Sequence, residues 1–172
     1  AETFPITINI ANEGNLPSAT KTVTIKPNTG VTASVSAVGA STSAFIIRNS
    51  YVTIDGSNAG STDRSLTITN TSTTAPGVVL IASSGTTPIT NVALKNSIII
   101  NGANTNTAVA VTDLAGTAGY FNNITIQNNS VQKAYIGIYA LAFVATGNGS
   151  GLLVSGNDLN TSGANSIRLV GI

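Results

Sequence analysis

Short runs of alternating apolar and polar residues fill the chain, and most of them end at Asn, Asp or Gly. Alternation with a period of two is typical of a half-buried β-strand, and these three residue types favour the tight turns that follow strands. The pattern therefore predicts an all-β chain of short strands and indicates no helix. The expected strands are Ile6–Ile10, Val23–Ile25, Phe45–Ile47, Val52–Asp55, Leu66–Asn70, Val78–Ile81, Val92–Leu94, Ile98–Asn101, Ala108–Val111, Ile124–Ile126, Ile136–Ile138, Leu152–Val154 and Ile167–Val170.

A longer repeat decides how these strands are arranged. Asn96, Asn129 and Asn157 follow similar apolar segments at intervals of 33 and 28 residues. A second class of strands recurs at intervals of 30, 29 and 31 residues and is centred on Val79, Val109, Ile138 and Leu169. A shared period of about thirty residues is typical of a solenoid and has no counterpart in a β-sandwich. The repeat therefore predicts a right-handed parallel β-helix.

Length and composition fit one such domain over residues 1–172, with about five or six coils. Ile, Val and Thr account for 58 of the 172 residues, whereas Glu, Gln and Lys total 8, which favours strands over helices. Aromatic residues make up only 5% of the chain, as a narrow lumen filled by aliphatic side chains requires. Residues 1–44 repeat less clearly and are expected to form N-terminal capping or irregular coils, and residues 45–172 the regular coils.

Charge and missing residue types exclude several kinds of chemistry. The chain has no Cys and no His, so it offers no thiolate or imidazole to a metal and no catalytic triad that uses an imidazole base. The net charge of +1 gives no basic surface for nucleic acid. The longest apolar run, Ala134–Ala145, is too short to cross a membrane. We therefore expect neither a nucleic-acid partner nor membrane insertion.

Four segments resemble known β-helix repeats. The stretch Tyr51–Asn58, followed by Asp63–Thr71, is similar to segments of large exported surface proteins from Bacteroidetes-type bacteria, which carry pectin-lyase-like parallel β-helix repeats. The phrases Val92–Ile98 and Ile124–Val131 are similar to the generic β-helix repeat. The resemblance covers roughly residues 45–172. It implies an extracellular or cell-surface location. Enzymes that share this fold act on acidic polysaccharides through clustered acids and a basic residue. The resemblance therefore also implies that such a cluster should be sought in this chain.

The acids of this chain do not form such a cluster in the sequence. Asp55, Asp63, Asp113 and Asp158 fall on different predicted coils or loops, although paired carboxylates could still form across coils. Asp55 precedes a glycine and suits a turn, Asp158 takes the Ser position of the repeat, and Asp63 with Arg64 suggests an ion pair at a loop tip. We therefore assign no catalytic, cofactor-binding or metal-binding residue and expect no cofactor.

Polysaccharide remains an alternative partner. Lys95, Asp113 and Lys133 are the only charged residues whose spacing suggests a common groove, and that spacing does not match the coil period. Carbohydrate could also stack on exposed aromatic rings, although we favour packing in the lumen or against a long loop for these residues. The aromatic candidates are Tyr120, Phe121, Tyr135, Tyr139 and Phe143. The Thr-x-Thr pairs, such as Thr67 with Thr69, do not recur at the coil period and do not favour an ice-binding face.

The last predicted strand carries the functional hypothesis. Ile167–Ile172 ends without a polar cap, and Thr3–Ile10 could pair with it in another subunit. We therefore expect an extracellular structural or adhesive module, stacking head to tail on identical subunits or adjoining domains of the same polypeptide. A polysaccharide-binding or polysaccharide-degrading β-helix protein is the second hypothesis. An antiparallel β-sandwich adhesion domain is the third.

Overall fold

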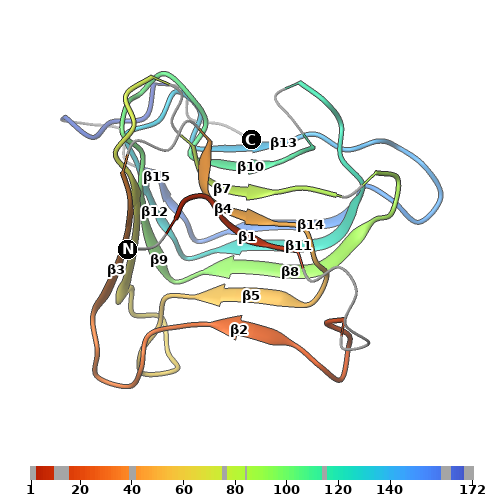
Figure 1. Cartoon of the computed structure of the whole chain (residues 1–172), viewed down its shortest axis with the longest axis horizontal. Coiled ribbons are helices and arrows are strands. Elements are labelled where there is room, and N and C mark those ends of the chain that lie inside the picture. The colour runs from red at the N-terminus through yellow and green to blue at the C-terminus, as the bar shows by residue number, and fades with distance from the viewer. Residues whose placement is uncertain are drawn as a thin grey trace.

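A computed structural model describes residues 3–9, 16–38, 42–74, 77–83, 85–113, 116–159 and 164–168. All regular structure in these residues is β-strand, and the strands form three parallel sheets that wind into a β-solenoid (Figure 1). The first sheet contains β1 (Ile6–Ile8), β4 (Ser43–Ile47), β7 (Gly77–Ile81), β10 (Val109–Val111) and β13 (Ile138–Ala140). The second contains β2 (Val23–Ile25), β5 (Val52–Asp55), β8 (Ile89–Lys95), β11 (Phe121–Gln127) and β14 (Ser150–Ser155). The third contains β3 (Ala33–Ala37), β6 (Leu66–Asn70), β9 (Ser97–Ile100), β12 (Ser130–Gln132) and β15 (Asp158–Leu159).

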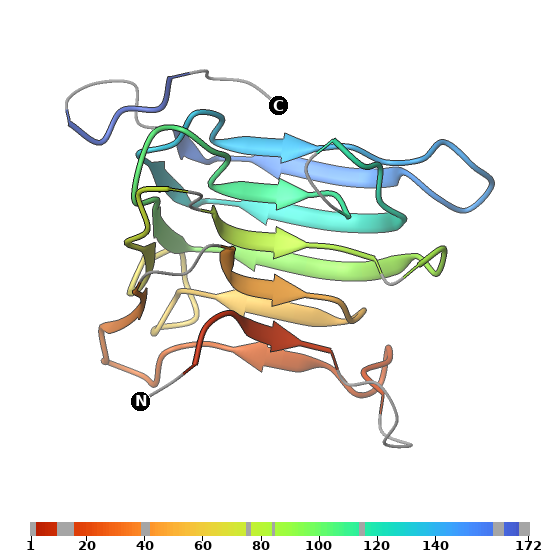
Figure 2. The same cartoon turned by 45° about the horizontal axis from the view of Figure 1, so that its top comes forward.

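The chain visits the three sheets in a fixed order and climbs one strand spacing with each turn (Figure 2). We call the turn from the first to the second sheet the first corner, from the second to the third the second corner, and from the third to the first the third corner. From β1 to β13 the chain makes about four full turns. The predicted parallel β-helix is therefore confirmed, with slightly fewer coils than the five or six expected.

The strand register confirms one of the two sequence repeats and corrects the other. Val79 pairs with Val109 and Val109 with Ile138, as predicted, while Leu169 lies outside the described residues. Lys95 pairs with Gln127, so Asn96 lies beside Asn128 and not beside Asn129. The sequence alignment was wrong by one residue here because two Asn residues follow one another at the second corner.

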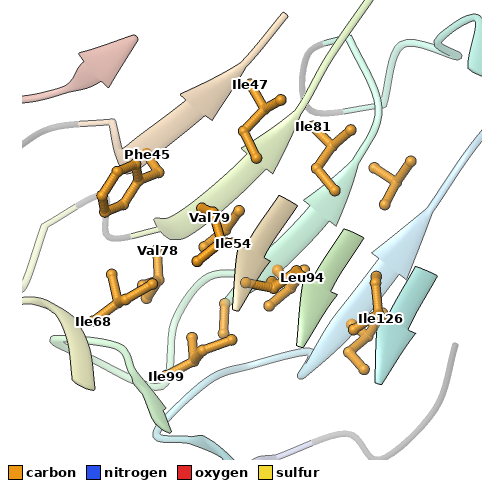
Figure 3. Close-up of a cluster of buried hydrophobic side chains, with 14 of the residues drawn as sticks. Phe45, Ile47, Ile54, Ile68, Val78, Val79, Ile81, Leu94, Ile99 and Ile126 are labelled. Atoms are coloured by element: carbon orange, nitrogen blue, oxygen red, sulfur yellow. The ribbon is translucent and has the colours of Figure 1, made fainter. Parts of the chain in front are cut away.

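Stacked aliphatic side chains fill the lumen. Figure 3 shows Ile47 and Ile81 of the first sheet facing Ile54 and Leu94 of the second, with Ile99 of the third sheet beside them. Each of these five side chains is at most 1% exposed. Full burial of one such side chain contributes about 1.5–3 kcal/mol. Different aliphatic residues stack on one another at equivalent inward positions of successive coils, such as Ile54 and Leu94. The residue type therefore varies from coil to coil while the structure repeats.

Residues with left-handed backbone mark the corners and the strand starts. Asn91 (φ 57°), Asn123 (φ 52°) and Gly151 (φ 69°) occupy equivalent places in consecutive strands of the second sheet. At the second corner the same role falls to Asn96 and Asn128, with φ of 55° and 52°. Asn tolerates this conformation better than other residues that have a side chain. Asn therefore recurs at places where successive coils repeat the same left-handed backbone conformation.

The two ends of the described chain differ from the sequence expectations in detail. Residues 1–44, expected to cap the solenoid or to be irregular, contribute the first strand of each sheet. β3 was not expected, because its Ala and Ser residues give little apolar contrast. Ile167 and Arg168 lie outside any strand, and residues 169–172 of the predicted last strand lie outside the described residues. The described part of the chain contains no helix long and apolar enough to cross a membrane.

Candidate functional site

Polar side chains gather at the second corner, where the chain leaves the second sheet. Asp55 ends β5 and Lys95 ends β8, and Asn96 and Asn128 form the turns of the next two coils. Between β5 and β6 the corner is enlarged into a loop over residues 56–65. This corner is the candidate functional site, because it combines acids, bases and amides on neighbouring coils.

A chain of hydrogen bonds links three coils at this corner. The Asn96 amide nitrogen donates to Asp55 Oδ1 at 2.7 Å, and the Asn128 amide nitrogen donates to Asn96 Oδ1 at 2.8 Å. Lys95 Nζ lies 3.1 Å from Asp55 Oδ2. Burial alone raises the pKa of Asp55, but the hydrogen bonds from Asn96 and the Ser57 backbone N–H, together with Lys95, outweigh it and hold this pKa below its ordinary value. Asp55 therefore remains a carboxylate and accepts the last hydrogen bond of the amide ladder formed by Asn128 and Asn96.

Asp63 organises the loop over residues 56–65. Its carboxylate accepts hydrogen bonds from the hydroxyls of Ser57 at 2.5 Å, Ser65 at 2.7 Å and Ser61 at 3.0 Å. The Asn58 backbone N–H donates to the same group at 3.1 Å. These donors stabilise the ionised carboxylate and hold the pKa of Asp63 well below its ordinary value, and the hydrogen bond from Ser57 has the largest effect. All four donors belong to the loop itself, so the carboxylate serves to fix the loop's shape.

Arg64 joins this loop to the coils beyond it and not to its neighbour Asp63. Its Nε donates to the Asn128 carbonyl at 2.8 Å and its Nη2 to Asn128 Oδ1 at 3.0 Å. Its Nη1 lies 3.9 Å from Asp158 Oδ2. The predicted Asp63–Arg64 ion pair is therefore wrong, because the two side chains point to different partners. The placement of Asp158 beside Ser130, by contrast, is the one predicted.

A second amide ladder lies inside the same corner. Asn129 is 0% exposed, and its amide nitrogen donates to the Leu94 carbonyl and to Asn157 Oδ1, both at 3.0 Å. Its Oδ1 accepts the Ser97 backbone N–H at 3.1 Å. These bonds join three consecutive coils. Breaking them would leave a buried amide without partners, which is costly, so they hold the coils together. The sequence repeat predicted that Asn129 and Asn157 are equivalent. It did not show that the corner has two ladders, an inner one through Asn129 and an outer one through Asn96 and Asn128.

The three charged residues with groove-like spacing do not meet. Lys95 stands at the second corner, Asp113 follows β10 at the first corner, and Lys133 follows β12 at the third corner. Asp113 accepts a hydrogen bond from Ser83 Oγ at 2.5 Å, and Arg48 donates to the Ser83 carbonyl at 2.7 Å. Among the described residues no group of three or more His, Cys, Asp or Glu could hold a metal ion. Lys95, Asp113 and Lys133 therefore lie at three different corners and do not converge.

The aromatic residues divide into two groups. Phe121 is 4% exposed and fills the lumen, as expected, together with Phe45. Tyr120 and Phe143 instead stack on each other outside the lumen, with ring centroids 5.2 Å apart, and Phe143 is half exposed. Tyr135 lies against Arg168, whose guanidinium carbon is 5.4 Å from the ring centroid. Of the two placements expected, lumen packing therefore does not apply to Phe143, which packs instead on Tyr120 of the long loop before β11, because the loop between β13 and β14 carries it away from the core.

The hydroxyl surface of the third sheet is interrupted. Thr67 pairs with Ser34 on one side but with Ile98 on the other. Thr69 likewise lies between Ser36 and Ile100. The Thr-x-Thr motif is therefore confined to one coil, as its lack of recurrence in the sequence predicts.

Comparisons of the chain with protein-family models, with curated proteins and with solved structures return no match.

Proposed function

We propose that this chain is an extracellular structural or adhesive β-helix module. The observation that carries the proposal is the use of charged side chains as links between coils. Asp55 with Lys95 joins neighbouring coils, and Arg64 reaches Asn128 two coils away. A scaffold needs such links, whereas an enzyme of this fold needs acids and bases directed at one groove.

The first corner supports the same function. Arg48 donates to the carbonyl of Ser83 in the next coil, and Ser83 donates to Asp113 in the coil beyond. Partly buried polar links of this kind make local opening less favourable, because several bonds must break together. The sequence resemblance around Tyr51–Asn58 adds the extracellular location, since the repeats that it resembles belong to exported surface proteins.

Labelling of intact cells tests this proposal. An antibody raised against the purified domain is applied to intact and to permeabilised cells of the source organism, with a cytoplasmic protein as the control. We expect labelling of intact cells that is lost after external protease treatment. Labelling that appears only after permeabilisation would overturn the extracellular assignment.

Glycan binding is the second candidate, and Phe143 is the observation that favours it. This ring is half exposed and is held by stacking on Tyr120, so it offers one free face to a sugar ring. Affinity electrophoresis in gels containing acidic or neutral polysaccharides, with Phe143→Ala as the matched variant, separates this candidate from the first. Retardation of the unmodified chain that disappears in Phe143→Ala would favour glycan binding, and equal mobility in all gels would reject it.

A further inference from the structure

The inner columns of the solenoid are buried in the middle and partly exposed at both ends. In the second sheet, Ile54, Leu94 and Ile126 are each 0% exposed, while Ile25 below them and Val154 above them are only half-buried. The third sheet repeats this arrangement in a column formed by Val35, Ile68, Ile99, Val131 and Leu159. At each end of the described stack, aliphatic side chains are therefore partly exposed, whereas their equivalents in the middle coils are fully buried.

The end strand β14 is the most open of these surfaces. Leu152 is 36% and Leu153 48% exposed, whereas Ile124, the partner of Leu152 in the strand below, is 0% exposed. Among the described strands β14 pairs with β11 alone, and β2, at the other end of the same sheet, pairs with β5 alone. The first sheet ends differently, because Ile167, whose side chain lies against Gly137, is 5% exposed and Ile138 is 0% exposed. Of these two sheets, the second is therefore the more exposed at this end.

Strand direction identifies what fits this edge. Every pairing in the second sheet is parallel, so a second copy shifted along the solenoid axis brings its β2 beside β14 in the same direction. The shift continues the inner column by placing Ile25 of the second copy on Val154. It also continues the outer column, in which the register joins Thr24, Thr53, Ala93, Thr125 and Leu153.

Charge at the second corner agrees with this pairing. Lys26 is exposed and follows β2 directly, and the Asp158 side chain at the start of β15 is 64% exposed. When β2 of one copy lies on β14 of another, Lys26 and Asp158 meet at the same corner with opposite charges. An exposed pair of this kind contributes little affinity, but it favours this register over shifted ones.

We propose that β14 is a docking edge for β2 of a second copy of this chain, so that the second sheet continues from one molecule into the next. The proposal rests on the proposed structural function and adds the partner and the strands that meet. The contact joins two different surfaces, and because a shift along the solenoid axis does not close into a ring, it can extend into a filament.

A cysteine pair tests this contact, because the chain has no other Cys. In the double variant Thr24→Cys with Leu153→Cys, the two thiols of one molecule lie four strand spacings apart, about 19 Å, and cannot react with each other. Between stacked molecules the same positions are about 4.8 Å apart, within the Cα separation of about 4.4–6.8 Å that a disulfide requires. We expect a ladder of dimers, trimers and larger species on a non-reducing gel after mild oxidation, which a reductant collapses.

The matched control pairs Thr24→Cys with Thr125→Cys, which has the same outward direction but lies one strand inside the edge. Cross-linking of the test pair at least tenfold above this control supports the contact, and equal cross-linking of both pairs overturns it. Sedimentation of Thr24→Pro gives an independent measurement, because Val23 N–H bonds to Tyr51 and so Thr24 N–H faces the open edge. The proline variant should remain monomeric at concentrations where Thr24→Val associates, and the same association in both would contradict the proposal. These measurements use purified protein, so their failure leaves the test on intact cells unaffected.

Discussion

Gly56 lies against the backbone carbonyl of Asn96 so closely that a Cβ on Gly56 would sit 1.9 Å from that oxygen. Real Cβ atoms do not approach an oxygen so closely, and the obstacle is backbone of the next coil and not a flexible side chain. The spacing between two coils at the second corner therefore depends on the absence of a side chain at residue 56.

Gly56→Ala is expected to lower the free energy of unfolding by about 3 kcal/mol, because the two coils must separate to admit the methyl group. Denaturant unfolding followed by circular dichroism measures the change. Gly30→Ala is the matched control, since Gly30 has a φ of +74° but no atom within 4 Å of an added Cβ. It should lose only about 1 kcal/mol through backbone strain. Equal losses in the two variants would contradict the close approach.

Asn129→Ala is expected to destabilise the chain by about 2 kcal/mol, because the Ser97 N–H and the Leu94 carbonyl lose their partner inside the corner. Thermal unfolding compared with Thr105→Ala, at an exposed loop residue, provides the measurement. A melting temperature unchanged from that of the control would show that the inner ladder contributes nothing to stability.

Stability should fall in acid because Asp55 and Asp63 both have a lowered pKa in the folded chain. A carboxylate of this kind stabilises the fold above its unfolded pKa, and this contribution is lost as the pH falls through its folded pKa. We expect the melting temperature to be steady above the ordinary aspartate value of 3.8 and to decline below it.

The matched variants for this pH dependence are Asp63→Asn and Asp55→Asn. Each should reduce the slope of melting temperature against pH below that value, since an amide has no proton to gain there. Slopes identical to that of the unmodified chain in both variants would assign the acid sensitivity to other groups.

Arg64→Ala is expected to lower the free energy of unfolding by about 1–2 kcal/mol, because it removes two hydrogen bonds from a charged donor to Asn128. Arg64→Lys should not restore them, since an ammonium lacks the planar fork of the guanidinium. Amide hydrogen exchange at Asn128, whose N–H bonds to the Ser155 carbonyl, should accelerate in both variants. Unchanged exchange there, with Lys26→Ala as the control, would contradict a link across two coils.

The sequence predicted the solenoid because the inner aliphatic positions recur wherever the connections are of similar length. Val79, Val109 and Ile138 were aligned correctly for this reason. The period could not show which of Asn128 and Asn129 lies beside Asn96, since both are Asn and either one could form the corner. β3 was missed because two of its three inward residues, Ala33 and Ala37, differ little in polarity from the Ser residues beside them, which leaves Val35 as its one strongly apolar residue.

The polar links were less predictable than the strands. Asp63 and Arg64 are adjacent in sequence, and an ion pair between them was the simplest expectation. The structure instead directs Arg64 to Asn128, 64 residues away, because stacking brings distant corners together. Only the register reveals such partners, and the register depends on loop lengths that vary from coil to coil.

The register between coils creates the polar links at the corners. The pairing of Thr53 with Ala93, across the longest connection in the second sheet, tests it most directly. The double variant Thr53→Cys with Ala93→Cys should form an intramolecular disulfide under mild oxidation, measured as the loss of free thiol in the monomer. Thr53→Cys with Thr125→Cys, about 10 Å apart across two strand spacings, should retain both thiols. Free thiols in the first pair, or a disulfide in the second, would contradict the register and with it the Asp55–Lys95 link.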